Sequence, residues 1–298
     1  MSEADAVERV DEPATVASLA SDLRDLDIAA GDTLFVHSSL SALGWVCGDA
    51  PAVVDALQTV LTDAGTLVMP THSPQYTNPA DWSAPPVPDD WIDPIREQRP
   101  AYRPETTPTR GMGAIPECFR NYPGVIRSAH PTVSVAAWGA DADAIAGDHA
   151  LDYGLGESSP LARLYDHDAA VLMLGTGHET NTSLHLAEHR AAISLETTTN
   201  RVPIIDNGER VLVDYKLLDG HTDDFPDLGA AFEAQAEPTT AQSPTQPHCS
   251  LSNRHSSISQ LSGSRSIGNL AHSKRWNSDF ANVKASNSSI LENRQGTT

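Results

Sequence analysis

The sequence predicts an α/β fold, a single three-layer-like domain in which a mixed sheet is flanked by helices. Short apolar runs typical of buried strands alternate with segments whose apolar residues recur at helical spacing. Two such runs, Thr33–His37 and Thr66–Met69, enclose a helical segment, and this strand–helix–strand order points to α/β. The 298 residues are 39% apolar, which is enough for one sizeable core.

The expected elements follow from caps and periodicity. A first helix runs from Pro13 to about Leu26, with the proline at its first position. A second helix begins at a cap, Asp49, and ends at Gly65. The remaining expected elements are a short helix at 114–121, strands at 132–138 and 169–174, helices at 158–165 and 181–193, and a late strand or hairpin arm at 210–215.

The stretch from Thr71 to Arg110 is rich in Pro and Trp and shows no clear period. Loops of this length are usually functional or disordered. Several bulky residues argue that this one is packed, namely Trp82, Trp91, Ile92, Ile95 and Tyr102. We therefore expect it to form one wall or lid of a substrate site.

Composition limits the classes of partner. The formal net charge of −21 repels nucleic acid and anionic membranes and attracts polycations. The acid-rich, Lys-poor usage before residue 237 is typical of proteins from salt-adapted, halophilic microbes. No run approaches about 18 apolar residues, and the acidic N-terminus lacks the apolar stretch of a signal peptide, so we expect a cytoplasmic protein. Cys47, Cys118 and Cys249 indicate neither a disulfide framework nor a metal cluster.

The charge balance changes near residue 237. Residues 237–298 hold three acidic and six basic residues, whereas the preceding 236 residues hold 37 acidic and 13 basic ones. The later segment is also rich in Ser, Asn and Gln and lacks regularly spaced apolar residues. We therefore expect an acidic N-terminal extension (1–12), a folded domain (13–236) and a tail (237–298) that is either disordered or translated out of frame.

The strongest local constellation is VLMLGTGHETNTSLHLAEHRA, residues 171–191, which reads as strand, glycine turn and helix. Gly175 and Gly177 allow the backbone to approach a ligand closely. A helix starting at Asn181–Thr182 offers N–H groups to an anion or a developing oxyanion. The turn is not a dinucleotide fingerprint, because Thr180 stands where the third glycine would be.

On this helix, His185 and Glu188 lie three residues apart and share a face. A carboxylate beside an imidazole, as Glu188 would be beside His185, fixes the tautomer of the ring, and the pair can deprotonate an incoming amine. An exposed helical pair without a catalytic role is one alternative. A second is a zinc hydrolase, because His185 to His189 match the H-x-x-E-H pattern of inverted zinc peptidases, although no clear third ligand follows.

Two further segments are candidates for holding an anionic cofactor. Strand-end loops of α/β sheets are favoured ligand sites, and glycines beside a basic residue at a helix entrance can cradle a phosphate. The candidate residues are His37, Ser38, Ser39 and Leu40 after the first strand, and Arg110, Gly111, Met112 and Gly113 before the helix at 114–121. Serines that only cap a turn are the alternative for the first segment.

Seven segments, in order, resemble the aminoglycoside 3-N-acetyltransferase family. They are FVHSSLSALGWVCG (35–48), GTLVMPTHS (65–73), PPVPDDW (85–91), TPTRGMGAIPECFR (107–120), RSAHPTVSVAAWG (127–139), LGESSPLARLY (155–165) and LGTGHETNTSLHLAEHRA (174–191). Their order and spacing extend through most of residues 15–235.

The resemblance implies direct transfer of acetyl from acetyl-CoA to an amine, which in aminoglycosides is the 3-amine of the 2-deoxystreptamine ring. It implies His185 as the base, oriented by Glu188 or another carboxylate, and coenzyme A held by the two candidate segments. We expect substrate contacts from His72, His178 and Asn181, and no metal. The expected partner is a small-molecule polyamine, with no nucleic acid and no membrane.

One region departs from the family. After DFPDLGAAFE (224–233), family members continue into a further strand and a closing helix, whereas here the unusual tail follows. A truncated, catalytically inactive pseudoenzyme that still binds coenzyme A is therefore the alternative function.

Overall fold

The computed structural model describes residues 3–191, 196–220, 222–235 and 271–275. Its main sheet has six strands in the order β3-β4-β2-β1-β5-β8. These strands are β1 (Thr33–Ser38), β2 (Thr66–Pro70), β3 (Ile126–Arg127), β4 (Val135–Gly139), β5 (Ala170–Leu174) and β8 (Ala271–Arg275). The sheet is mixed, because β2, β1 and β5 run parallel while β4, β3 and β8 pair antiparallel with their neighbours.

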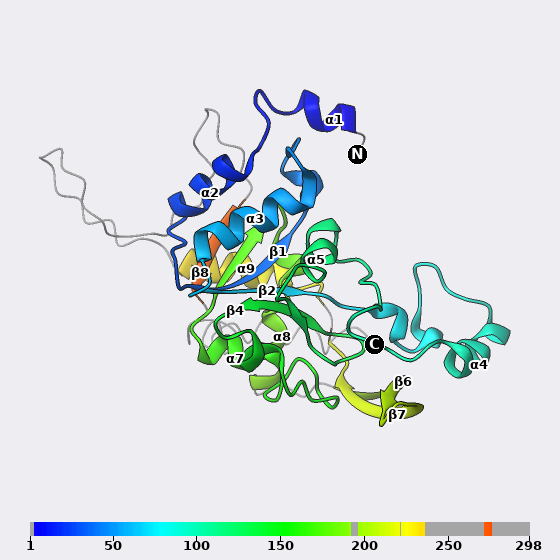
Figure 1. Ribbon diagram of the computed structural model, residues 1–298. Helices are drawn as coiled ribbons and strands as arrows, with labels where there is room; N and C mark the ends of the chain where they lie inside the picture. The colour runs from blue at the N-terminus through cyan, green and yellow to red at the C-terminus, as the bar shows by residue number, and fades with distance from the viewer. Residues whose placement is uncertain (1–2, 192–195, 221, 236–270, 276–298) are drawn as a thin grey trace, which may run out of the picture.

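Helices cover both faces of this sheet, which confirms the three-layer prediction (Figure 1). The helices of the described residues are α1 (Glu3–Glu8), α2 (Val16–Asp25), α3 (Asp49–Leu61), α4 (Asp89–Gln98), α5 (Ala114–Phe119), α6 (Ala142–Ala146), α7 (Pro160–Asp166), α8 (Leu184–Arg190) and α9 (Phe225–Gln235), of which α1 and α4 lie away from the sheet. Leu34 and Val36 pack in one core with α2, α3 and α5, whereas Phe35 packs in another with α6 to α9. The alternation of side chains along a strand therefore separates two cores.

Side-chain caps explain where helices begin. The first predicted helix starts at Val16 rather than Pro13, because Thr15 accepts a hydrogen bond from the backbone of Ser18 and forms a capping box. The predicted start of α7 is confirmed, since Ser159 caps it and Pro160 occupies its first position.

The helix predicted at 181–193 begins later, at Leu184. The chain first makes a short 3-10 turn, His178–Thr180 (η4), and the side chain of Asn181 then accepts the backbone N–H of Ser183. The helix ends at Arg190, and its predicted end at Ile193 lies outside the described residues.

The long segment 71–110 contains structure that periodicity did not predict. It forms 3-10 turns at Pro74–Tyr76 (η2) and Pro79–Asp81 (η3), then α4, which has Pro94 in its interior. Tyr102 is buried as predicted, whereas Trp91 is 56% exposed. The late hairpin arm is β7 (Glu209–Leu218), and its partner β6 (Thr197–Asp206) was not predicted.

Two segments beyond the predicted domain take part in the fold. Residues 3–8 of the expected N-terminal extension form α1. In the expected tail, β8 pairs with β5 over five residues, which differs from the prediction that the tail lies outside the fold. None of the described helices is long and apolar enough to cross a membrane.

Candidate active site

The predicted pair on α8 forms a hydrogen bond. His185 Nδ1 lies 2.7 Å from Glu188 Oε2. Glu188 is 3% exposed, and the His185 side chain is 20% exposed. The ring of His185 also meets the edge of Phe225, from α9, at a centroid distance of 4.9 Å. Because an ionised carboxylate only accepts hydrogen bonds, Nδ1 carries the proton and the other nitrogen, Nε2, is left as an acceptor.

The end of β1 holds the start of the α8 region in place. The backbone N–H of Thr182 donates to His37 Nε2 at 2.9 Å. Burial, with smaller contributions from His72 and His178, lowers the pKa of His37 to about 3. His37 is therefore neutral, and its proton is on Nδ1 because Nε2 accepts.

The glycine turn after β5 lets these segments approach closely. Gly175 has a φ of +73°, and a Cβ there would lie 2.8 Å from Ala42 Cβ and 3.0 Å from Ser39 O. Only glycine fits this position without a shift of its neighbours. The turn therefore brings the β5–α8 connection against the Ser39 turn.

The three predicted substrate residues lie in different surroundings. His72 has a buried Nε2 with no hydrogen-bond partner in the described part of the chain, and desolvation, then His185, His130 and Arg127, lower its pKa to about 3. His178 Nδ1 lies 3.2 Å from the amide nitrogen of Asn181. Asn181 is 1% exposed, and its Oδ1 accepts hydrogen bonds from the backbone N–H and the hydroxyl of Ser183, so the side chain holds this turn together.

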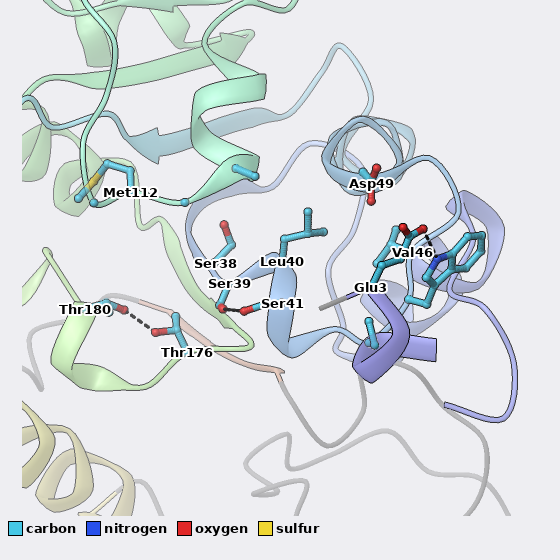
Figure 2. Close-up of a pocket in the computed structure, with 16 residues that line it drawn as sticks. Glu3, Ser38, Ser39, Leu40, Ser41, Val46, Asp49, Met112, Thr176 and Thr180 are labelled. Atoms are coloured by element: carbon cyan, nitrogen blue, oxygen red, sulfur yellow. Dashed lines mark hydrogen bonds between the residues drawn. The ribbon is translucent and has the colours of Figure 1, made fainter. Parts of the chain in front are cut away.

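A cavity of about 710 Å³, called cavity A, lies beside the ends of β1 and β5 (Figure 2). It is lined by Glu3, Ala6, Ser38, Ser39, Leu40, Ser41, Gly44, Trp45, Val46, Asp49, Gly111, Met112, Gly113, Ala114, Thr176 and Thr180. Six of the eight predicted cofactor residues therefore meet at one cavity, although residues 41–109 separate the two segments in the sequence.

The other two predicted cofactor residues do not line cavity A. His37 instead accepts a hydrogen bond from the backbone N–H of Thr182, just before α8. Arg110 is exposed, and its backbone N–H donates to the carbonyl of His72. A phosphate contact from Arg110 would therefore have to be made outside cavity A, and it stays a prediction.

A second cavity, of about 180 Å³ and called cavity B, adjoins the pair on α8. It is lined by His130, Thr132, Val133, Tyr153, Gly154, Leu155, His185, Glu188, His189, Tyr215, Leu217, Leu218 and Gly220. Tyr215 is anchored there by Thr132 and Asn200, each at 2.8 Å. Tyr153 and Tyr215 were not predicted. Tyr215 reaches cavity B from β7 and Tyr153 from the loop between α6 and α7, and no local pattern marks either residue.

The zinc alternative lacks a ligand set in the described part of the chain, where no group of three or more His, Cys, Asp or Glu is arranged to hold a metal ion. His185 instead directs Nδ1 at Glu188. The H-x-x-E-H letters are better explained by the hydrogen-bonded pair.

Comparison with known proteins places these features in one family. The family model for aminoglycoside 3-N-acetyltransferase matches residues 35–255. The SPbeta prophage-derived aminoglycoside N(3')-acetyltransferase-like protein YokD of Bacillus subtilis (strain 168) is 47% identical over 231 residues, 77% of this chain and 84% of that protein. The crystal structure of YokD aligns with a TM-score of 0.82 and 36% identity, over 98% of this chain and 99% of the other.

Two further proteins show the same relationship. Aminoglycoside N(3)-acetyltransferase IX of Micromonospora chalcea is 36% identical over 72% of this chain and 75% of that enzyme. The structure of AAC-IIIb in a binary complex with CoASH aligns with a TM-score of 0.73 and 28% identity, over 95% of this chain and 98% of that one. The chain is thus an acyltransferase that belongs to the aminoglycoside 3-N-acetyltransferase family.

Proposed function

We propose that the protein transfers an acetyl group from acetyl-CoA to the 3-amine of the 2-deoxystreptamine ring of an aminoglycoside, with His185 as the general base. The observation that carries this proposal is the 2.7 Å hydrogen bond between His185 Nδ1 and the buried carboxylate of Glu188. It leaves Nε2 free to accept a proton from an attacking amine.

His185 and Glu188 have separate roles in the proposed reaction. His185 Nε2 takes the proton that the amine loses as the new carbon–nitrogen bond forms. Glu188 holds the ring in the required tautomer and stabilises the positive charge that the ring acquires. The same proton then passes from Nε2 to the departing sulfur, so that His185 returns to its starting state.

Cavity A fits the uncharged pantetheine arm of coenzyme A, called its neutral arm below. Ser38 lines it, and the buried Oγ of Ser38 has no hydrogen-bond partner in the described residues, so a small rotation would let it donate to an amide carbonyl. Gly111 and Gly113 have φ values of +76° and +86° and expose backbone along the wall. Bound acetyl-CoA would supply the activated thioester carbonyl.

The acceptor is proposed to contact His72 and His178. His72 is kept neutral and has an unpartnered buried nitrogen, so it offers a hydrogen bond without repelling a cationic amine. His178 accepts from Asn181 at Nδ1, which leaves Nε2–H as a donor to a hydroxyl. A polycationic substrate also matches the net charge of −21.

We propose that the catalytic groups lie within residues 13–236, because every residue given a catalytic or substrate-binding role here falls in that range. A cytoplasmic location is a separate proposal. β8 adds an edge strand to the sheet.

The test is release of free coenzyme A thiol by the full chain, given acetyl-CoA and a panel of aminoglycosides in molar KCl. We expect thiol only when an aminoglycoside is present, and a product acetylated at the 3-amine by NMR. Acetylation at another amine would overturn the regiochemistry. Binding of coenzyme A without any turnover would favour the inactive pseudoenzyme.

A further inference from the structure

The N-terminal segment, residues 3–14, forms part of the wall of cavity A. Ala14 bridges to Val46, and its N–H donates to the Trp45 carbonyl at 3.0 Å. Val10 packs so closely on Gly44 that a Cβ on that glycine would lie 2.3 Å from Val10 Cγ1. These contacts dock the segment on the loop after β1.

Docking brings a carboxylate to the cavity. Trp45 Nε1 donates to Glu3 Oε1 at 3.4 Å, and Glu3 lines cavity A from α1. Asp49 lines it from the first turn of α3 (Figure 2). Among the described residues that line cavity A, the charged ones are Glu3 and Asp49, and both are negative.

This charge conflicts with the chemistry of the proposed acyl donor. Coenzyme A carries a diphosphate and a further phosphate, so it is a polyanion at neutral pH. A site that held these phosphates by ion pairs would be lined by Lys or Arg, as phosphate sites usually are. Cavity A suits the neutral arm but electrostatically opposes the phosphates.

We propose that Glu3 and Asp49 determine how tightly the protein binds its acyl donor, by repelling the donor's phosphates to an extent that salt controls. The inference rests on the proposed use of acetyl-CoA. It predicts an inverted salt dependence, in which the KM for acetyl-CoA falls as KCl rises. At 1 M salt the Debye length is about 3 Å, so exposed charges no longer act across the cavity.

The test compares Glu3→Gln and Asp49→Asn with the unaltered full chain. Gln keeps an acceptor for Trp45. Asn tolerates the φ of 54° that Asp49 adopts, so both changes remove charge with little change in shape. At about 50 mM KCl each variant lowers the KM for acetyl-CoA by about two- to fivefold, and in 2 M KCl the difference disappears.

Two controls make the result specific to cavity A. Glu8→Gln removes the same charge from the same helix, but Glu8 is exposed and does not line the cavity, so its effect should be less than half as large. S-acetylpantetheine carries no phosphate, so its KM should not respond to Glu3→Gln. Three results would each overturn the inference. Glu8→Gln could lower the KM for acetyl-CoA as much as Glu3→Gln does, or Glu3→Gln could lower the KM for S-acetylpantetheine equally. The third is a KM for acetyl-CoA that rises with salt.

Failure of the proposed function can be told apart from failure of this inference. Calorimetry with coenzyme A alone measures binding without turnover. If no acetyl transfer occurs but Glu3→Gln still tightens coenzyme A binding at low salt, the inference stands and the proposed reaction fails. If neither variant changes the affinity for coenzyme A at low salt, the inference is wrong.

Discussion

One hydrogen bond determines which nitrogen of His185 is available to a substrate. The bond from Nδ1 to Glu188 was predicted from their spacing of three residues, because such positions share a helix face. Six of the eight predicted cofactor residues line one cavity. His37 and Arg110 do not line it, and the sequence does not show whether a polar side chain points into a cavity or packs under a helix.

Replacing Glu188 with Gln tests the role of its charge. Gln can still accept from His185 Nδ1, so the ring keeps its tautomer, but the protonated ring loses its charged partner. Hydrogen bonds to charged groups contribute about 1.5–3 kcal/mol, so we expect kcat to fall about 10- to 100-fold with little change in KM. Steady-state kinetics at saturating acetyl-CoA measures this, and an unchanged kcat would exclude Glu188 from the mechanism.

Some helices and strands can be predicted from local sequence, whereas others depend on contacts with residues that are distant in the sequence. Strands β1, β2 and β5 and helices α3 and α7 were predictable, because their periodicity and caps are local. Helix α4 was missed because Pro94 interrupts its pattern, and β6 because a polar half-exposed strand is recognisable only beside β7. The late start of α8 depends on the bonds of Asn181, which periodicity does not encode.

Helix α9 packs against η4 through a glycine. A Cβ on Gly229 would lie 2.1 Å from His178 Cγ, and Asn181 holds that ring from the other side. We expect Gly229→Ala to lower the free energy of unfolding by about 1–3 kcal/mol, because overpacking strains a close contact. Urea unfolding measures this. Ala230→Ser, at an exposed position of the same helix, is the control, and equal stabilities for the two variants would contradict the contact.

Strand β8 provides the edge partner of β5. All five residues of β5 are buried, and their outer backbone groups pair with β8. A chain ending at residue 236 should therefore melt several degrees lower than the full chain, because it leaves those backbone groups unpaired. An unchanged melting temperature would show that β5 needs no partner from the tail and would support a catalytic domain that ends at 236.

At the scale of the whole molecule, buried histidines make stability depend on pH. Burial lowers the pKa of His130 to about 4 and that of His149 to about 3, as it does for His37. An unfolded histidine has a pKa of about 6.5, so the unfolded chain takes up protons first as the pH falls. The stability that these neutral histidines contribute is therefore complete above about pH 6.5 and is lost progressively as the pH falls from about 6.5 to about 4 for His130 and about 3 for His37 and His149.

These three histidines and His72, whose pKa burial also lowers to about 3, together predict a steep acid transition. Each of the four adds about 1.4 kcal/mol of destabilisation per pH unit in that window, so the free energy of unfolding should fall by about 5 kcal/mol between pH 6 and 5. Urea unfolding at both pH values, at constant high salt, measures the change. A free energy that is equal at the two values would contradict the neutral, buried state of these side chains.

The central claim is that His185 is the base in acetyl transfer, and the most direct measurement is the kcat of His185→Ala in the thiol-release assay. The matched control is His167→Ala, which removes a histidine that pairs with Asp141 at the end of α7, away from both cavities. We predict a fall of about 10²- to 10⁴-fold for His185→Ala and close to full activity for the control. A fall of less than about threefold, with the fold intact by circular dichroism, would contradict the account.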